Sequence, residues 1–98
     1  MIVAIVTYRP EGLSSAEVEQ RFDASIPVFS AMPGLARKYF CFDEARGLGT
    51  SVYLWESREA AERCFGGAAF LERFRASFGC EPSIDYIPAK LVVDGPAA

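Results

Sequence analysis

The sequence predicts an α+β domain in which helices cover one face of a four-stranded antiparallel sheet, in the order β-α-β-β-α-β. Four segments rich in β-branched and aromatic residues are typical of strands: residues 2–8, 35–43, 49–56 and 82–93. Two regions in which apolar residues recur with helical periodicity lie between the first and second strands and between the third and fourth. The chain has 98 residues, which is the size of a single domain.

The first strand, residues 2–8, ends at the turn-forming run Arg9-Pro10-Glu11-Gly12. Ser14 and Glu17 have the spacing of a capping box, so a helix is predicted to begin there. The apolar residues on one face of this helix are Val18, Phe22, Ile26 and Phe29. Pro27 predicts a kink or a break, because proline lacks a backbone N–H and disfavours helical geometry in the preceding residue.

A short glycine-containing segment joins the second and third strands, residues 35–43 and 49–56, which predicts a hairpin. Ser57 is a helix cap for the second helical region, and Gly66-Gly67 divides that region into two pieces. The second piece carries a stripe of aromatic residues that is interpreted as core, and it stops at Gly79. The stripe consists of Phe70, Phe74 and Phe78.

The fourth strand, predicted at residues 82–93, contains Pro88, and proline within a strand is tolerated only at a sheet edge or a bulge. We expect one domain over residues 1–94, followed by a short tail at 95–98. The N-terminal segment reads as a strand and not as a signal peptide, and no apolar run approaches the ~20 residues that span a bilayer. A soluble, cytoplasmic protein with no membrane partner is therefore expected.

Composition excludes several classes of function. Ten Lys and Arg against thirteen Asp and Glu give a net charge of −3, so a nucleic-acid partner is not expected. The chain has no histidine, which is the commonest metal ligand and the side chain best suited to proton transfer near neutral pH. Its three cysteines, Cys41, Cys64 and Cys80, form no CxxC pair. Because no GxGxxG or P-loop occurs either, we expect no metal, haem or flavin cofactor.

The strands are apolar on both sides, whereas helices are available to cover only one face of the sheet. In the third strand, Val52 and Leu54 point one way and Tyr53 and Trp55 the other. Strands that are apolar on both sides must be covered on both sides. The simplest second cover is another copy of the same sheet, packed about 10 Å away. The sequence therefore predicts a homodimer formed through the open sheet face.

This pattern resembles the ferredoxin-like domains of the dimeric α+β barrel superfamily. Two local runs carry the resemblance: Met32-Pro33-Gly34-Leu35, which leads from the first helix into the second strand, and the strand-to-helix junction at residues 52–62, VYLWESREAAE. They are similar to the YdhR-like and antibiotic-biosynthesis-monooxygenase-like members. The resemblance implies a dimeric barrel, and it implies a cofactor-independent monooxygenase that binds a small aromatic molecule between helices and sheet.

In relatives of this kind, a tryptophan at the position of Trp55 lines the pocket with an asparagine on the first strand and a histidine on the second helix. Here the first strand ends Val6-Thr7-Tyr8 and the second helical region has no histidine, so only Trp55 matches. Haem ligation through histidine is excluded. The alternative class of function is a non-catalytic small-molecule binder or a structural dimer of the same fold.

The candidate substrate-binding residues follow from strand alternation around Trp55. Tyr53 and Ser51 share its side of the third strand, and Tyr8 ends the first strand nearby. On the second strand, either Arg37, Tyr39 and Cys41 or Lys38, Phe40 and Phe42 face the helices, and the sequence does not fix this register. The candidates are Trp55, Tyr53, Tyr8, Tyr39 and Arg37. The other interpretation is that these aromatics fill the core. The charged residues Glu59, Glu62, Arg63, Arg73 and Arg75 are interpreted as a solvated helix surface.

Overall fold

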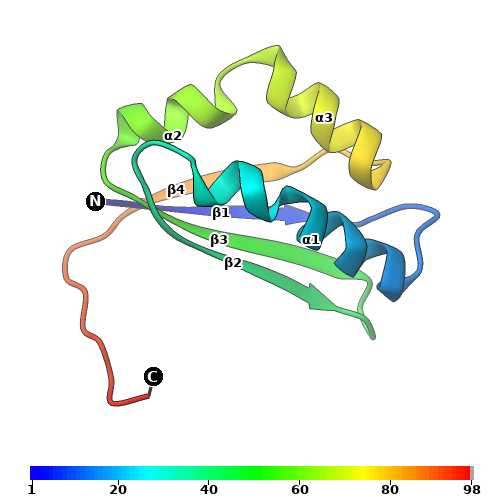
Figure 1. Cartoon of the computed structure of the whole chain (residues 1–98), viewed down its shortest axis with the longest axis horizontal. Helices are drawn as coiled ribbons and strands as arrows, with labels where there is room; N and C mark the ends of the chain where they lie inside the picture. The colour runs from blue at the N-terminus through cyan, green and yellow to red at the C-terminus, as the bar shows by residue number, and fades with distance from the viewer. Residues whose placement is uncertain (98) are drawn as a thin grey trace.

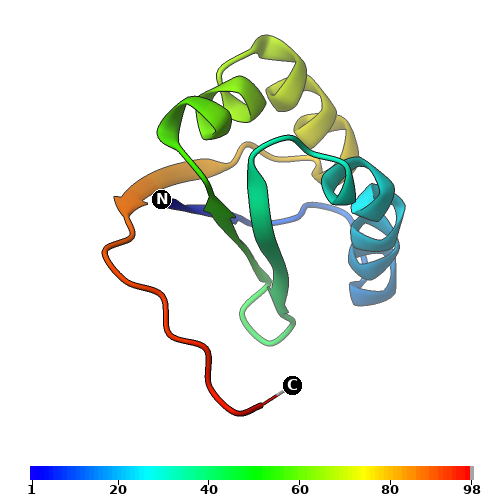
Figure 2. The ribbon, with the colours of Figure 1, turned by 60° about the vertical axis from the view of Figure 1, so that its left-hand side comes forward.

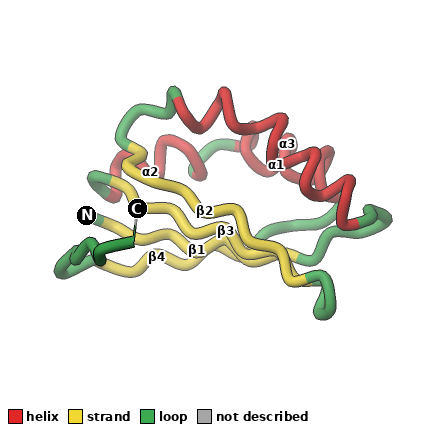
Figure 3. Tube along the Cα trace, turned by 60° about the horizontal axis from the view of Figure 1, so that its bottom comes forward, coloured by secondary structure: helices red, strands yellow, loops and turns green. Residues whose placement is uncertain are grey.

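A computed structural model describes residues 1–97. Its elements are β1 (Ile2–Tyr8), α1 (Ser15–Ser30), β2 (Leu35–Asp43), β3 (Leu48–Trp55), α2 (Arg58–Phe65), α3 (Ala68–Phe78) and β4 (Ser83–Pro88). The predicted order is confirmed, with the second helical region divided into α2 and α3 at the two glycines. The sheet is antiparallel throughout, in the order β2-β3-β1-β4, and all the helices lie on one face of it (Figures 1 and 3). This is the ferredoxin-like arrangement.

Helix α1 begins as predicted, because the Ser14 hydroxyl accepts from the Glu17 backbone N–H and the Glu17 carboxylate accepts from the Ser14 backbone N–H. Of the predicted kink or break at Pro27, the break is wrong, since α1 continues to Ser30. Pro27 lies in the last turn on the exposed side of the helix. There the carbonyl that loses its partner can bond to water, so one missing hydrogen bond does not end the helix.

Strand β4 is shorter than predicted, because it ends at Pro88 and not at residue 93. It pairs only with β1, and Pro88 at its end lies opposite Ile2, the first residue of β1. One further backbone bond, from the Ala89 N–H to the Met1 carbonyl at 3.0 Å, closes the ladder. Residues 89–97 then leave the sheet on the side away from the helices (Figure 2).

The core lies between the helices and the inner face of the sheet. Alternate residues of β1 and β3 point into it, and Trp55 and Tyr53 are its largest fully buried side chains. Their rings stack at 5.7 Å, and Phe65 of α2 meets the Trp55 indole edge-on at 5.7 Å. Helix α3 adds Phe70, which packs on Phe65 at 5.0 Å. The predicted helical aromatic stripe therefore belongs partly to this core.

The Tyr8 ring packs directly over Gly49, in space that a side chain at position 49 would occupy. The two residues pair across β1 and β3, and a Cβ at position 49 would overlap the Tyr8 ring atoms. We expect Gly49→Ala to lower the free energy of unfolding by about 1–3 kcal/mol, because the ring must leave its rotamer. Gly47→Ala is a poor control, since Gly47 has a φ of 61°. Gly67→Ala is the better one, because nothing lies within 4 Å of its added Cβ. Equal stability of the two variants in urea unfolding would contradict this packing.

The face of the sheet opposite the helices carries apolar side chains. Val3, Ile5, Val52 and Leu54 are half-buried there, and Ile87 of β4 is 49% exposed. The C-terminal segment lines a groove together with this face through Val92, Val93, Asp94, Gly95 and Ala97. Leu91 and Val93 are 89% and 88% exposed. In residues 1–97, no helix is both long enough and apolar enough to cross a membrane.

Candidate functional site

An irregularity in β2 decides which of its side chains face the helices. Leu35 pairs with Trp55 but Arg37 pairs with Leu54, so Ala36 is an extra residue in β2. The shift places Lys38 opposite Tyr53 and Phe40 opposite Ser51, on the helix-covered side. Of the two registers that the sequence leaves open, the structure therefore has the one in which Lys38 and Phe40 point inward.

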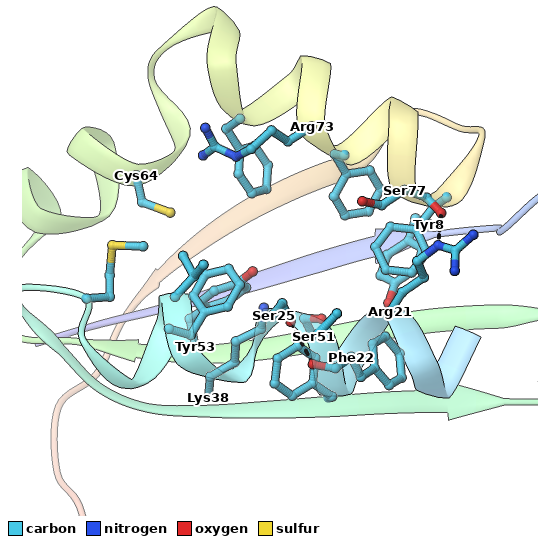
Figure 4. A pocket seen from close by; sticks show the side chains of 18 residues that line it. Tyr8, Arg21, Phe22, Ser25, Lys38, Ser51, Tyr53, Cys64, Arg73 and Ser77 are labelled. Atoms are coloured by element: carbon cyan, nitrogen blue, oxygen red, sulfur yellow. Dashed lines mark hydrogen bonds between the residues drawn. The ribbon is translucent and has the colours of Figure 1, made fainter. Parts of the chain in front are cut away.

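A cleft of about 260 Å³ lies between α1 and α3, above β2 and β3 (Figure 4). Its walls are mainly aromatic, and they come from both helices and from the sheet beneath them. Its lining residues are Tyr8, Arg21, Phe22, Ala24, Ser25, Val28, Phe29, Met32, Lys38, Phe40, Ser51, Tyr53, Cys64, Phe70, Arg73, Phe74, Ser77 and Phe78. Concave sites with apolar walls and a few polar groups are typical of small-molecule binding.

Lys38 is the one lysine in this cleft, and its ammonium group is surrounded by rings. Nζ lies 3.4 Å from the ring centroid of Phe29, 4.0 Å from that of Phe40 and 4.5 Å from that of Tyr53. Burial lowers the pKa of Lys38 from 10.5 to about 7, because the cleft replaces water around the charge. The ring faces attract the cation by roughly 0.5–2 kcal/mol, which offsets only part of the several kcal/mol that desolvation costs.

Two tyrosines bring hydroxyl groups into the cleft, and both are nearly fully buried. Burial raises the pKa of Tyr8 to about 12, and a hydrogen bond with the Ser51 hydroxyl opposes part of that rise. Burial also raises the pKa of Tyr53. Both phenols therefore remain protonated at neutral pH and can donate a hydrogen bond to a ligand. Neither can act as a general base there.

The charged groups of the cleft all have the same sign. Arg21, Lys38 and Arg73 line it, and no carboxylate is among its lining residues in the described part of the chain. The Arg21 guanidinium donates to the Ser77 carbonyl at 3.2 Å and so joins α1 to α3 across one end of the cleft. This is a positively charged site on a protein whose net charge is −3. Such a site attracts anions.

The structure separates the predicted site residues into three groups. Tyr8 and Tyr53 line the cleft. Trp55 is 0% exposed and does not reach the cleft, so the expectation that it forms part of the wall does not match the geometry. Its indole Nε1 is buried without a hydrogen-bond partner among the described residues. Arg37 and Tyr39 lie on the open face, where the guanidinium donates to the phenol oxygen at 3.2 Å.

Lys38 and Arg73 are cleft residues that sequence reasoning did not select. A signal for Lys38 was present, because it alternates with Phe40 and Phe42 in a strand and a lysine on an apolar face is unusual. This signal could select Lys38 only if the register of the second strand were known, and the extra residue Ala36 shifts that register. Arg73 was interpreted as solvated helix surface. Its side chain is exposed, but it lies above the cleft beside Cys64 (Figure 4).

No metal centre is evident in residues 1–97, where the acidic and cysteine side chains form no cluster of three or more that could hold an ion. The thiols of Cys41, Cys64 and Cys80 are free. Burial raises the pKa of the Cys64 thiol, which lines the cleft, so it is protonated at neutral pH. The titratable groups of the cleft thus consist of an amine, two phenols and a thiol, together with two guanidinium groups.

Comparison with protein-family models and with curated proteins finds no match to this chain. Solved structures do match over nearly its whole length. SnoaB, a cofactor-independent oxygenase from Streptomyces nogalater, is 17% identical, with a TM-score of 0.73 and coverage of 96% of this chain and 97% of that one. The monooxygenase ActVA-Orf6 from Streptomyces coelicolor, in complex with nanaomycin D, is 16% identical, with a TM-score of 0.66 and coverage of 96% and 92%.

A candidate antibiotic biosynthesis monooxygenase from Deinococcus radiodurans is 10% identical, with a TM-score of 0.73 and coverage of 99% of this chain and 100% of that one. At these identities the likeness is one of fold. The chain therefore has the ferredoxin-like fold of these antibiotic-biosynthesis-monooxygenase-like structures, as the resemblance in the sequence predicts.

Proposed function

We propose that the protein is a cofactor-independent monooxygenase that binds a small planar aromatic molecule in the cleft between α1 and α3. The observation that carries this proposal is the cleft itself, which combines aromatic walls with buried hydroxyl groups and one desolvated amine. The names of the structural neighbours support the reaction class, because two of them are an oxygenase and a monooxygenase. Trp55 has no part in this proposal, since it is buried in the core.

The volume of the cleft limits the size of the ligand. An apolar cavity of about 150 Å³ holds one benzene ring, and pockets for drug-sized ligands start near 300 Å³. A cleft of about 260 Å³ therefore favours one or two fused rings. The flat rings would pack edge-on or offset against Phe22, Phe29 and Phe74, while Tyr8 and Tyr53 donate hydrogen bonds to oxygen atoms of the ligand.

The reaction needs no electron source besides the substrate. When a phenol is oxidised at a ring carbon that carries hydrogen, one atom of O₂ bonds to that carbon. The other atom leaves as water with the hydrogens of the C–H and O–H groups. The ring becomes a quinone and O₂ is reduced, so atoms and electrons balance. The part of the protein would be to orient the ring, exclude water and stabilise the electron-rich anion that reacts with O₂.

The test is oxygen uptake with one- and two-ring phenols and hydroquinones, with no cofactor added and a chelator present. We expect saturable uptake, and with ¹⁸O₂ one labelled atom in the quinone and one in water. Ala24→Trp should abolish uptake, because Ala24 lines the cleft and the indole would fill its mouth. Ala16→Trp is the matched control, since Ala16 is an exposed residue of α1 outside the cleft. Saturable binding without uptake would instead identify a non-catalytic binding protein.

We also propose that the protein is a homodimer formed through the open sheet face. The apolar side chains of β1 and β3 on that face and the exposed Ile87 support this, because a sheet that is apolar on both sides is stable only when both faces are covered. A second copy of the sheet has the same twist and the same apolar face, so the two can pack face to face.

A buried charge should disrupt this dimer. Sedimentation at micromolar concentration should give twice the 10.7 kDa of one chain, and Val52→Asp or Leu54→Asp should weaken association by several kcal/mol. Ala16→Asp, which adds the same charge on the exposed side of α1, should leave the dimer intact. A wild-type protein that sediments as a monomer would contradict the proposed assembly.

A further inference from the structure

Lys38 is a cation without a counter-ion among the residues that line its cleft. Its Nζ lies within 4.5 Å of three aromatic ring centroids, and the 18 lining residues in the described part of the chain include no aspartate or glutamate. Buried charges in proteins are normally paired, because an unpaired ion loses its hydration without compensation. The amine of Lys38 therefore either loses its proton or takes a negative partner from outside the residues that line the cleft.

The other groups that face Lys38 also favour a negative partner. Tyr53 of β3 lies beside it and Cys64 of α2 lines the same cleft, and both are kept protonated by burial. Arg21 of α1 and Arg73 of α3 complete the charged groups of the cleft, and both are cations. Figure 4 shows Lys38 entering from β2 below, with Arg73 on the opposite wall. A ligand in this space has cations on two sides and no repelling carboxylate.

We propose that Lys38 accepts the proton of an aromatic hydroxyl group bound in the cleft and then holds the phenolate as its counter-ion, so that the site selects small planar phenols. This inference rests on the proposed binding of an aromatic molecule in the cleft. In the step, the O–H bond of the phenol breaks, its proton bonds to the lone pair of Nζ, and the electron pair stays on the oxygen. No redox change occurs.

The aromatic surroundings suit both halves of the step. While Lys38 is neutral, the apolar cleft stabilises it, and the pKa of about 7 leaves a large neutral fraction at physiological pH. When the proton has moved, the ammonium lies against the three ring faces and the phenolate lies against the ammonium. The low polarity of the cleft strengthens this ion pair. A phenol ether or an unsubstituted aromatic ring has no hydroxyl proton to transfer, so it cannot form this ion pair with Lys38.

The experiment uses 4-nitrophenol, whose phenolate is coloured and whose phenol is not, under conditions without oxygen. Binding is measured at about pH 8, above the pKa of Lys38, where the amine is mostly neutral and the free probe is ionised. Wild-type protein should bind the coloured phenolate and take up one proton onto Lys38, which calorimetry in buffers of different ionisation enthalpy counts. 4-Nitroanisole, which has the same shape without the hydroxyl group, should bind at least ~10-fold more weakly.

Two substitutions separate proton acceptance from mere charge. Lys38→Arg keeps a cation that cannot lose its proton, so it should bind the phenolate without proton uptake. Lys38→Met removes the charge and keeps a side chain of similar size, so this variant should bind the phenolate at least ~10-fold more weakly. Any 4-nitrophenol that it binds as the neutral phenol should lose its colour. Lys90→Met, which removes the other lysine at an exposed position, is the matched control and should behave as wild type.

The outcomes that overturn the inference are distinct from failure of the proposed function. Wild-type protein that binds both probes equally, binds the neutral phenol, or takes up no proton would overturn the role of Lys38 while leaving the cleft as a binding site. Binding of neither probe would overturn the inference together with the proposed cleft. Oxygen uptake is measured separately, so a protein that ionises the phenol but consumes no oxygen would support the inference and contradict the monooxygenase.

Discussion

Lys38→Met is expected to raise the free energy of unfolding by on the order of 4 kcal/mol at about pH 6. Burial lowers the pKa of Lys38 to about 7 in the folded protein from 10.5 in the unfolded chain. Below pH 7 both states carry the proton, so the whole cost of burying the ammonium is present. A tenfold change in a proton-binding constant corresponds to about 1.4 kcal/mol, and the ring contacts return part of the cost. Methionine has nearly the same length and no charge to bury.

The sign of the pH dependence follows from the same two pKa values. Between pH 7 and 10.5 the unfolded chain holds the proton and the folded protein does not, so wild-type stability rises with pH across this window. The gain from Lys38→Met should therefore shrink from about pH 6 to about pH 10. Urea unfolding at both pH values, at fixed protein concentration, measures this, with Lys90→Met as the control. A Lys38→Met protein that is less stable than wild type at the lower pH would contradict the burial of an unpaired charge.

Trp55→Ala is expected to lower the free energy of unfolding by about 3–5 kcal/mol, the range for deleting a large buried aromatic side chain. Trp55 is 0% exposed, stacks on Tyr53 and is met edge-on by Phe65. Trp55→Phe should lose less, about 2 kcal/mol or below, because it leaves a smaller cavity and removes the buried indole N–H that lacks a partner among the described residues. Urea unfolding compares the three proteins.

The two Trp55 variants also separate a core residue from a binding residue. Because Trp55 does not line the cleft, Trp55→Phe should retain the affinity for 4-nitrophenol within about twofold. A stable Trp55→Phe protein that no longer binds 4-nitrophenol would show that Trp55 is a binding residue. Unchanged stability of Trp55→Ala would show that the indole is not packed as the structure has it.

Most of the fold could be predicted from local signals, because those signals agreed with tertiary packing. The capping box at Ser14, the paired glycines at 66 and 67 and the cap at Ser57 all act within a few residues, and each is present in the structure. The errors lie where the outcome depended on distant residues. Strand β4 ends where β1 has no further residues to pair with it. Helix α1 continues past Pro27 because that residue lies on the side of the helix that faces water.

The candidate site was predicted less well, and one residue explains most of the difference. Alternation along a strand tells which side chains share a face but not which face is covered. In β2 the extra residue Ala36 sets the answer, so Lys38 points into the cleft and Arg37 and Tyr39 point away from it. Burial of Trp55 depended on how closely α2 approaches the sheet, which its position in the sequence does not give. The cleft does include Tyr8 and Tyr53, which were selected from the sequence because Tyr53 shares the side of Trp55 on the third strand and Tyr8 ends the first strand nearby.

A titration of Lys38 by NMR measures directly whether its amine is poised to accept a proton in the cleft. The chain has two lysines, Lys38 and Lys90, so ¹³C labelling at lysine Cε gives two signals that Lys90→Arg assigns. We expect Lys38 to titrate near pH 7 in the free protein. A saturating unreactive phenol should then raise this pKa by at least about one, because the phenolate stabilises the ammonium. Titration of Lys38 at the ordinary lysine value of 10.5, or a pKa that does not respond to the phenol, would contradict this role.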